Sequence, residues 1–356
     1  MIQTLTLGPS DRLLVIAPHP DDESAATGGL LQHALATGAA TRVIFFTDGD
    51  NNPWAQRASE LRWRIGSADR ARFGAKRREE VRAALAHLGV PETCARFLGY
   101  PDQSTTDLLL HGTELALTKL ASEIGEWRPT ILVGPSLLDL HPDHSALGVL
   151  LHLALDTLGG MAPVRHHVRF LVHNPRLRAK HEGAVVLPLE AKQQERKRAA
   201  ILCHRTQLVL RGSWLPGFAE PEERFYMCEP AVGLADHPVR SAHRDASSLT
   251  FTLDSQNHFR SLGARTLCLV SHPPEQPVAA VAVRLPTRGG PASVINLRDQ
   301  RAVGNAAFSG RAGHGILRLP LTLLPDSDRL FAKIERRYGF FDEAGWKELR
   351  PEDPSA

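Results

Sequence analysis

A short apolar run near the start of the chain, Arg12 to Ala17 (RLLVIA), most strongly limits the fold. An unbroken apolar run of this length is typical of a strand buried on both faces of a sheet, and the two prolines that follow end it. From Ser24 to Gly38, apolar residues recur at spacings of three and four, which predicts a helix. Arg42 to Thr47 is a second apolar strand. A strand, a helix and a strand in close succession predict a parallel α/β sheet.

The same alternation continues along the chain. We predict helices from about Arg77 to Leu88 and from Leu115 to Trp127, and strands from Arg96 to Leu98 and from Thr130 to Val133. Helices alternating with strands are typical of an open sheet with helices on its faces. The stretch 51–74 is too long for a simple connector. We expect it to form either a lip over the site or a solvated surface insert.

The character of the chain changes after Pro230. Short alternating runs predict a small β-sandwich, and they occupy Leu249 to Leu253, Thr266 to Val270, Val278 to Leu285, Ser293 to Leu297 and Ile316 to Leu319. A chain of 356 residues, 42% of them hydrophobic, is long enough for two cores. We therefore predict a first domain over residues 1–235, a polar linker over 236–248 and a smaller β-rich domain over 249–356.

Charge and cysteine content narrow the class of protein. The 42 Lys and Arg residues against 39 Asp and Glu residues give a formal charge of +3, which does not indicate a nucleic-acid partner. The four cysteines form no CxxC pair, which argues against a cysteine zinc site or a disulfide framework. Residues 1–11 lack the features of a signal peptide, and no apolar stretch is long enough to span a bilayer. We expect a cytoplasmic protein without a transmembrane segment, and the oligomeric state stays open.

Acidic and imidazole side chains gather directly after the first strand. His19, Asp21, Asp22 and Glu23 lie within five residues, an arrangement whose repulsion is costly unless a cation offsets it. Pro20 biases His19 toward an extended backbone, so that the chain returns Asp22 to the same point and leaves Asp21 free for proton transfer. Because sites in open α/β sheets lie at the carboxyl ends of strands, we interpret this segment as half of a metal site. Helix capping is the alternative, and for Glu23 we favour it.

A second cluster, His141-Pro142-Asp143-His144, follows the strand that ends at Val133. Alone it is weak evidence, because 17 histidines make chance clusters plausible. Together the two clusters supply three nitrogen or oxygen ligands with a position left for water, which is how catalytic zinc is held. A site without thiols favours Zn²⁺ and leaves Fe²⁺, cobalt and manganese open.

The segment Ala17 to Glu23 (APHPDDE) together with HPDH resembles the LmbE or PIG-L family of sugar N-deacetylases. Further agreements follow in order over about Leu13 to Met227, and they include Arg77, Glu80, Ala84, residues 98–102 (LGYPD), Lys197, Ala200, His204, Thr206 and Gln207. The resemblance implies a Rossmann-like domain that binds zinc and hydrolyses the acetamide of an amino sugar, releasing acetate.

Residue by residue, the resemblance assigns the metal to His19, Asp22 and His144 and the general base to Asp21. A zinc-bound water has a pKa of roughly 7, so Asp21 could take its proton as the water attacks the acetyl carbonyl.

The resemblance also implies roles around the metal. His141 would steady the charge on the tetrahedral intermediate, and Asp143 would orient a metal-site histidine. Arg77 and Asp102 would contact the sugar. The alternatives are a surface ion pair between Arg77 and Glu80, three residues apart on a helix, and a turn role for Asp102.

Other family-matching positions and the stretch 51–74 carry weaker expectations. We expect Lys197 to lie on the solvated face of a charged helix and His204 to be structural. Trp54 or Trp63 could stack on a sugar ring, and a phosphorylated glycan or nucleotide sugar could exploit the arginines at 57, 62, 64, 70, 72, 77 and 78.

The predicted function is thus a metal-dependent hydrolase that removes the N-acetyl group from an N-acetylglucosamine-type sugar or glycoconjugate. Two alternatives stay open: an amidase acting on a non-sugar amide, such as a thiol conjugate or antibiotic precursor, and a non-catalytic glycan-binding protein with a relic metal site. For the β-rich segment, glycan binding, dimerisation and covering of the catalytic domain all remain possible.

Overall fold

The computed structural model describes residues 5–180, 183–255, 265–273, 276–311, 313–325, 327, 329–336 and 339–350. Residues 1–4 of the N-terminal segment considered above lie outside this range. The chain forms two compact units, the first from residues 1–105, 121–136 and 155–230, the second from residues 106–120, 137–154 and 231–356. No helix in the described ranges is long and apolar enough to cross a membrane.

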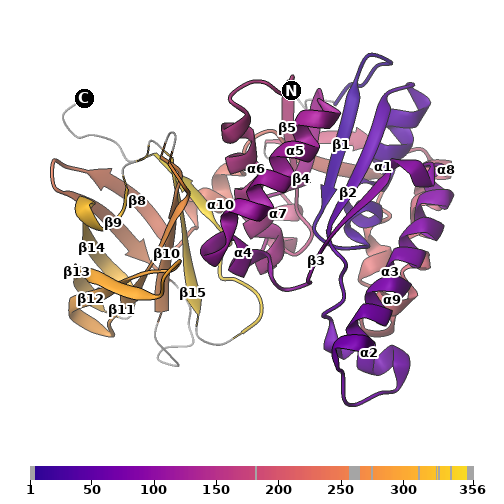
Figure 1. The fold of residues 1–356 in the computed structure, drawn as a ribbon. Coiled ribbons are helices and arrows are strands. Elements are labelled where there is room, and N and C mark those ends of the chain that lie inside the picture. The colour runs from indigo at the N-terminus through magenta and orange to yellow at the C-terminus, as the bar shows by residue number, and fades with distance from the viewer. Residues whose placement is uncertain are drawn as a thin grey trace. The chain divides into compact units, whose positions relative to one another are not determined.

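The first unit is built on a seven-stranded sheet with the order β3-β2-β1-β4-β5-β7-β6 (Figure 1). The strands are β1 (Arg12–Ala17), β2 (Ala40–Thr47), β3 (Ala95–Tyr100), β4 (Ile131–Pro135), β5 (His166–Phe170), β6 (Ala184–Pro188) and β7 (Glu222–Tyr226). The first five pair in parallel, whereas β7 pairs antiparallel with both β5 and β6. The predicted Rossmann-like, mostly parallel sheet is confirmed, and the strand order changes direction at β1, where such folds place their sites.

Helices connect these strands and largely follow the predicted pattern. They are α1 (Asp22–Ala36), α2 (Pro53–Glu60), α3 (Ser67–Leu88), α4 (Thr105–His111), α5 (Thr113–Trp127), α6 (Pro142–Leu158), α7 (Pro175–Arg178), α8 (Ala191–Cys203), α9 (Arg205–Arg211) and α10 (Ala231–Ala235). Short 3₁₀ turns occupy Glu92–Cys94, Leu215–Phe218 and Leu321–Leu323. The helix predicted from about Arg77 begins ten residues earlier, at Ser67. Its first turns are mostly exposed, so apolar periodicity does not reveal them.

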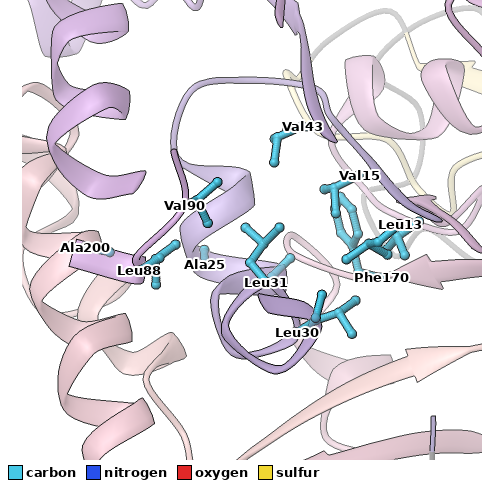
Figure 2. Packing of buried hydrophobic residues seen from close by; sticks show 14 of the residues in the cluster. Leu13, Val15, Ala25, Leu30, Leu31, Val43, Leu88, Val90, Phe170 and Ala200 are labelled. Carbon is cyan, nitrogen blue, oxygen red and sulfur yellow. The ribbon is translucent and has the colours of Figure 1, made fainter. Parts of the chain in front are cut away.

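The core of the first unit lies between the sheet and the layer formed by α1, α3 and α8 (Figures 1 and 2). Its members include Leu13, Val15, Leu30, Leu31, Val43, Leu88, Phe170 and Ala200. Leu14 and Ile16 are also fully buried, so β1 is covered on both faces as its sequence predicts. A Cβ at Gly29 of α1 would lie 2.3 Å from the Leu189 side chain, so a larger residue at this position would force that side chain to shift.

The second unit contains a nine-stranded antiparallel sheet with the order β16-β15-β10-β11-β12-β13-β14-β9-β8. The strands are β8 (Val239–Arg244), β9 (Ser248–Asp254), β10 (Arg265–Ser271), β11 (Ala279–Leu285), β12 (Arg288–Asn296), β13 (Arg301–Arg311), β14 (His314–Pro320), β15 (Leu330–Arg336) and β16 (Lys347–Leu349). The predicted β-rich domain is confirmed. Its strands form one continuous sheet that curls until β8 also lies near β15 and β16, whereas the expected sandwich assumed two sheets.

Part of the predicted polar linker is a strand. Residues 239–244 form β8 and pair with β9, with a register shift between Val239 and Ser241. The shift places both Val239 and Ala242 in the core, although they are three residues apart. This departure from strict alternation explains why the sequence did not reveal the strand.

Candidate metal centre

The loop after β1 turns sharply at Asp21. The φ of this residue is 140°, a strained backbone conformation that costs about 1–3 kcal/mol and is often found at functional sites. The turn is held by a hydrogen bond from the His19 backbone N–H to Asp22 Oδ2 (2.9 Å) and by one from the Asp21 backbone N–H to Glu23 Oε2 (2.9 Å). All four side chains are buried. The loop therefore brings Asp22 back to His19, as the sequence predicted.

His19 lies between two carboxylates. Its Nδ1 is 3.3 Å from Asp22 Oδ2, and its Nε2 is 3.0 Å from Asp102 Oδ1. Asp102 comes from the turn after β3, where its backbone N–H donates to Asp50 Oδ1 (2.9 Å). Burial would raise the pKa of the Asp102 carboxyl, but the His19 ring and the Arg77 guanidinium outweigh burial and lower it. In this structure Asp102 holds the His19 ring, and its contact with a sugar stays a prediction.

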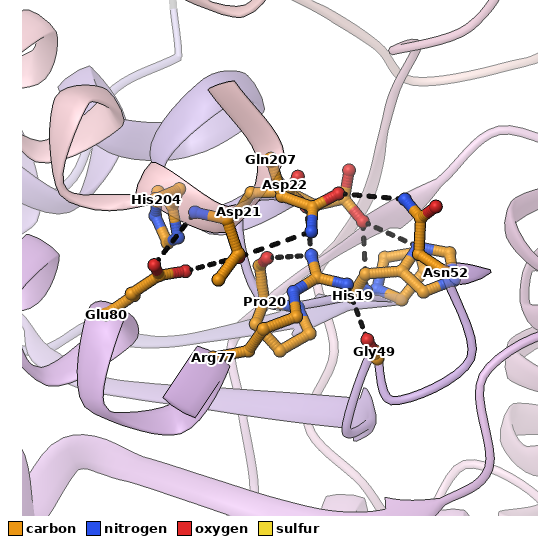
Figure 3. Close-up of polar contacts among 12 residues, drawn as sticks. His19, Pro20, Asp21, Asp22, Gly49, Asn52, Arg77, Glu80, His204 and Gln207 are labelled. Carbon is orange, nitrogen blue, oxygen red and sulfur yellow. Dashed lines mark hydrogen bonds and ion pairs between the residues drawn. The ribbon is translucent and has the colours of Figure 1, made fainter. Parts of the chain in front are cut away.

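Arg77 lies beneath the same loop, with only 2% of its surface exposed (Figure 3). Its Nη1 donates to the Gly49 carbonyl (3.0 Å), and its Nη2 donates to the Pro20 carbonyl and lies 3.4 Å from Asp21 Oδ1. Gly49 has a φ of +61°, and a Cβ there would lie 2.0 Å from Arg77 Nη1. The guanidinium thus ties α3 to the loops after β1 and β2.

Two charged residues that the sequence placed on exposed helix faces are buried. Glu80 accepts from the backbone N–H (2.9 Å) and Oγ1 (2.6 Å) of Thr206, which rules out the alternative of a surface ion pair with Arg77. Lys197 is also buried, and its Nζ lies 2.6 Å from Glu223 Oε1. Glu223 accepts as well from two backbone N–H groups of α1, which makes this ion pair a structural tie.

Sequence reasoning missed a buried pair behind the loop. Glu23 Oε1 lies 3.1 Å from His204 Nε2 and accepts from Ser24 Oγ (2.6 Å). Burial lowers the pKa of His204, but the charge and hydrogen bond of Glu23 outweigh burial and raise it above its ordinary value. Glu23 therefore steadies the backbone of Asp21 and binds His204, which is more than the capping role we expected. The structural role expected for His204 agrees with this contact.

The second cluster lies at the start of α6, in the second unit. The His141 backbone N–H donates to Asp139 Oδ1 (2.9 Å), and the Asp143 backbone N–H donates to His141 Nδ1 (3.3 Å). Asp139 Oδ2 is 3.5 Å from His144 Nδ1. Sequence reasoning passed over Asp139, although a carboxylate two residues before HPDH in the apolar segment LLDL was a usable signal. Asp139 therefore lies against the ring of His144, and the orienting role that the resemblance implies for Asp143 stays a prediction.

Buried histidine and aspartate side chains of the described residues form groups that could hold a metal ion. In each group, one ligand atom from every residue lies within 4.8 Å of the others, and the groups are His19 with His141 and His144, Asp22 with His144 and His173, and His19 with Asp102 and Asp143. The three predicted ligands are spread over the first two groups, which share His144. Imidazole nitrogens and carboxylate oxygens without thiols suit Zn²⁺ or Fe²⁺, so this donor set fits a divalent metal.

The stretch 51–74 consists of α2, a short loop and the first turns of α3. It begins beside the site, where Asn52 Nδ2 donates to Gln207 Oε1 (3.1 Å). Trp54 and Trp63 are exposed, and the Arg57 guanidinium carbon lies 5.0 and 5.4 Å from their ring centroids. Stacking of either ring on a sugar stays a prediction.

Comparison with known proteins finds a family match in the first part of the chain. A family model described as "PIG-L: GlcNAc-PI de-N-acetylase" matches residues 14–155. This part of the chain matches the PIG-L family. The match covers β1 to β4 and most of α6, and therefore both the HPDDE and the HPDH segments of the PIG-L domain.

Relatives of the PIG-L domain carry enzyme names. The chain is 34% identical over 146 residues to the 1D-myo-inositol 2-acetamido-2-deoxy-alpha-D-glucopyranoside deacetylase of Mycobacterium avium, a match covering 37% of this chain and 47% of that protein. The chain thus spans about half the length of the curated relatives it matches. Among solved structures, the conserved protein TT1542 from Thermus thermophilus has a TM-score of 0.47 at 25% identity, covering 62% of this chain and 95% of that one. The N,N'-diacetylchitobiose deacetylase from Pyrococcus horikoshii has a TM-score of 0.46 at 20% identity, covering 60% and 82%.

Proposed function

We propose that this protein is a metal-dependent hydrolase that removes the N-acetyl group from an N-acetylglucosamine-type sugar or glycoconjugate and releases acetate. The observation that carries the proposal is the gathering of buried imidazoles and carboxylates in groups able to hold a metal ion, from two segments of a PIG-L domain. An acetamido sugar is supported by the curated relatives, which are named as deacetylases of a 2-acetamido-2-deoxy-glucopyranoside.

We assign the metal to His19, Asp22 and His144. A bound Zn²⁺ or Fe²⁺ would polarise the acetyl carbonyl and supply a water that loses its proton near neutral pH. The protein prepares the ligands for this role: Asp102 binds His19 Nε2, so that Nδ1 faces Asp22, and Asp139 lies against His144 Nδ1. Carboxylates in such contacts fix the orientation of metal-binding imidazoles.

We assign proton transfer to Asp21 and stabilisation of the developing oxyanion to His141. Asp21 is buried and held by Arg77, so that its carboxylate can take a proton from water and return it to the departing amine. The Asp143 backbone N–H donates to His141 Nδ1, which leaves the ring proton on Nε2. From there it can donate to the oxyanion, a contact worth about 3 kcal/mol of barrier height.

The test is acetate release by the metal-loaded protein from N-acetylglucosamine and its nucleotide-linked, lipid-linked and inositol-linked derivatives, with non-sugar N-acetyl amides alongside. We expect turnover of at least one sugar and a loss of roughly 10²- to 10⁴-fold in Asp21→Asn, with metal still bound. The matched control is Asp11→Asn, a buried aspartate that binds Thr130 and Arg165 away from the site. Turnover of non-sugar amides alone, a near-normal rate in Asp21→Asn, or sugar binding without acetate release would each reject the proposal.

A further inference from the structure

The C-terminal strap, defined here as residues 339–346, lies across the loop that carries His141, and both belong to the second unit. The Asp342 backbone N–H donates to the Leu140 carbonyl (2.8 Å), and the Trp346 backbone N–H donates to the Leu137 carbonyl (2.7 Å). Gly345 has a φ of +74°, and a Cβ there would lie 2.2 Å from the Leu137 carbonyl oxygen. Backbone contacts this close hold the strap against the HPDH segment.

Charged side chains anchor the strap from both sides. Both carboxylate oxygens of Asp342 lie 3.3 Å from the buried Nζ of Lys333 on β15, and one accepts from Ser145 Oγ (3.3 Å) on α6. Lys333 Nζ also lies 5.3 Å from the ring centroid of the fully buried Trp346. The strap is therefore tied to the β-sheet and to the first turn of α6 by the same carboxylate.

Two aromatic rings of the strap lie beside His141. The Phe340 and Phe341 ring centroids are 4.9 and 6.0 Å from that of His141, both edge to face, and 5.2 Å from each other. Their surfaces are 46% and 43% exposed. Large apolar side chains that stay exposed beside polar groups of a candidate site are characteristic of ligand pockets.

We propose that Phe340 and Phe341 form an apolar subsite, through which the second unit selects substrates that carry an apolar group close to the scissile amide. The inference rests on the proposed function, in which His141 contacts the carbonyl oxygen. A substrate group next to that carbonyl would lie near Phe340 and Phe341, because their ring centroids are 4.9 and 6.0 Å from that of His141. Such a group is either a longer acyl chain or an aryl or alkyl aglycone, and both present the same apolar chemistry. The strap lies outside residues 14–155, so the family match does not include this subsite.

The test compares the wild type, the Phe340→Ala/Phe341→Ala double variant, the corresponding Leu double variant, and Ile316→Ala. Ile316, on β14, is 46% exposed like Phe340 and serves as the matched control. One substrate series lengthens the acyl group of N-acylglucosamine from acetyl to butyryl and hexanoyl. The other changes the glycoside of N-acetylglucosamine from none to methyl and benzyl. The readouts are the kcat/KM of each apolar member relative to the plain member, and the Kd values of the benzyl glycoside and of N-hexanoylglucosamine by calorimetry.

We expect the wild type to prefer the apolar members of one series, and the Ala double variant to lose that preference roughly ten-fold or more. The Leu variant should recover most of it, and Ile316→Ala should leave it unchanged. The series that responds identifies the acyl or the aglycone side. An equal preference in the wild type and the Ala double variant in both series, or Kd values for the benzyl glycoside and for N-hexanoylglucosamine that are both unchanged in the Ala double variant, would overturn the subsite. Absence of carboxylate release from every substrate would instead count against the proposed function, and the two Kd values would still decide the subsite.

Discussion

Replacement of Arg77 by lysine separates its two candidate roles. The guanidinium donates to the carbonyls of Gly49 and Pro20 and faces the Asp21 carboxylate. A hydrogen bond from a charged donor contributes about 1.5–3 kcal/mol, so the two together contribute about 3–6 kcal/mol. A lysine can keep one of them but lacks the fork that spans both. We therefore expect Arg77→Lys to lower the free energy of unfolding by about 1.5–3 kcal/mol.

The same substitution should affect turnover through Asp21. A displacement of about 1 Å in a catalytic group costs roughly 100-fold in rate, so kcat should fall far more than KM rises. Urea unfolding and steady-state acetate release measure the two effects. The control is Arg78→Lys on the same helix, because the ion pair of Arg78 with Asp48 is partly exposed and its loss should cost at most about 1 kcal/mol. Unchanged stability with a raised KM would refute the positioning role and favour the sugar contact predicted from the sequence.

Two further outcomes concern buried charges. Lys197→Met should lower the free energy of unfolding by about 3–5 kcal/mol, because it leaves the Glu223 carboxylate buried without its counter-ion. The double variant Lys197→Met/Glu223→Leu should recover part of that loss in urea unfolding. An equal or larger loss in the double variant would contradict this expectation. Burial lowers the pKa of His237, which contacts the strap at Gly345, from 6.5 to about 4. The unfolded chain therefore binds a proton at His237 more readily than the folded chain, and the free energy of unfolding should fall by about 2 kcal/mol between pH 7 and 5 through this residue. In His237→Gln this contribution should be absent, so the fall should be about 2 kcal/mol smaller. An identical pH dependence in both proteins would reject the buried neutral state.

The sequence predicted the helices and strands whose burial is evident from the pattern of neighbouring apolar residues. β1, β2 and β4 are unbroken apolar runs, and each becomes a central strand. It did not reveal β13, which alternates only weakly around Gly304 and Gly310, nor β15, whose central Lys333 is buried against Asp342. A buried lysine looks like an exposed one until its partner is known, and here the partner lies nine residues away on the strap.

In the candidate site, too, the sequence predicted local motifs but not the contacts between residues far apart in the chain. The motifs HPDDE and HPDH predicted the two parts of the candidate metal site. Acidic and histidine side chains clustered at the ends of strands repel one another, and such a cluster therefore indicates a bound ligand. The contacts that hold those halves join residues distant in the chain. Asp102 meets His19 because β3, β2 and β1 are neighbours in the sheet, and Arg77 meets Pro20 because α3 packs beside α1. The spacing of residues along the sequence does not predict these pairs.

The metal content of the protein decides whether the HPDDE and HPDH segments hold a divalent ion. Each protein is exposed to Zn²⁺ or Fe²⁺ and then dialysed exhaustively against metal-free buffer. Elemental analysis should find about one divalent ion per chain in the wild type and little in the double variant His19→Ala/His144→Ala. Circular dichroism should show that the wild type and the double variant are both folded. Wild-type protein that releases acetate at full rate with no bound divalent ion, or a double variant that retains the ion, would contradict the account.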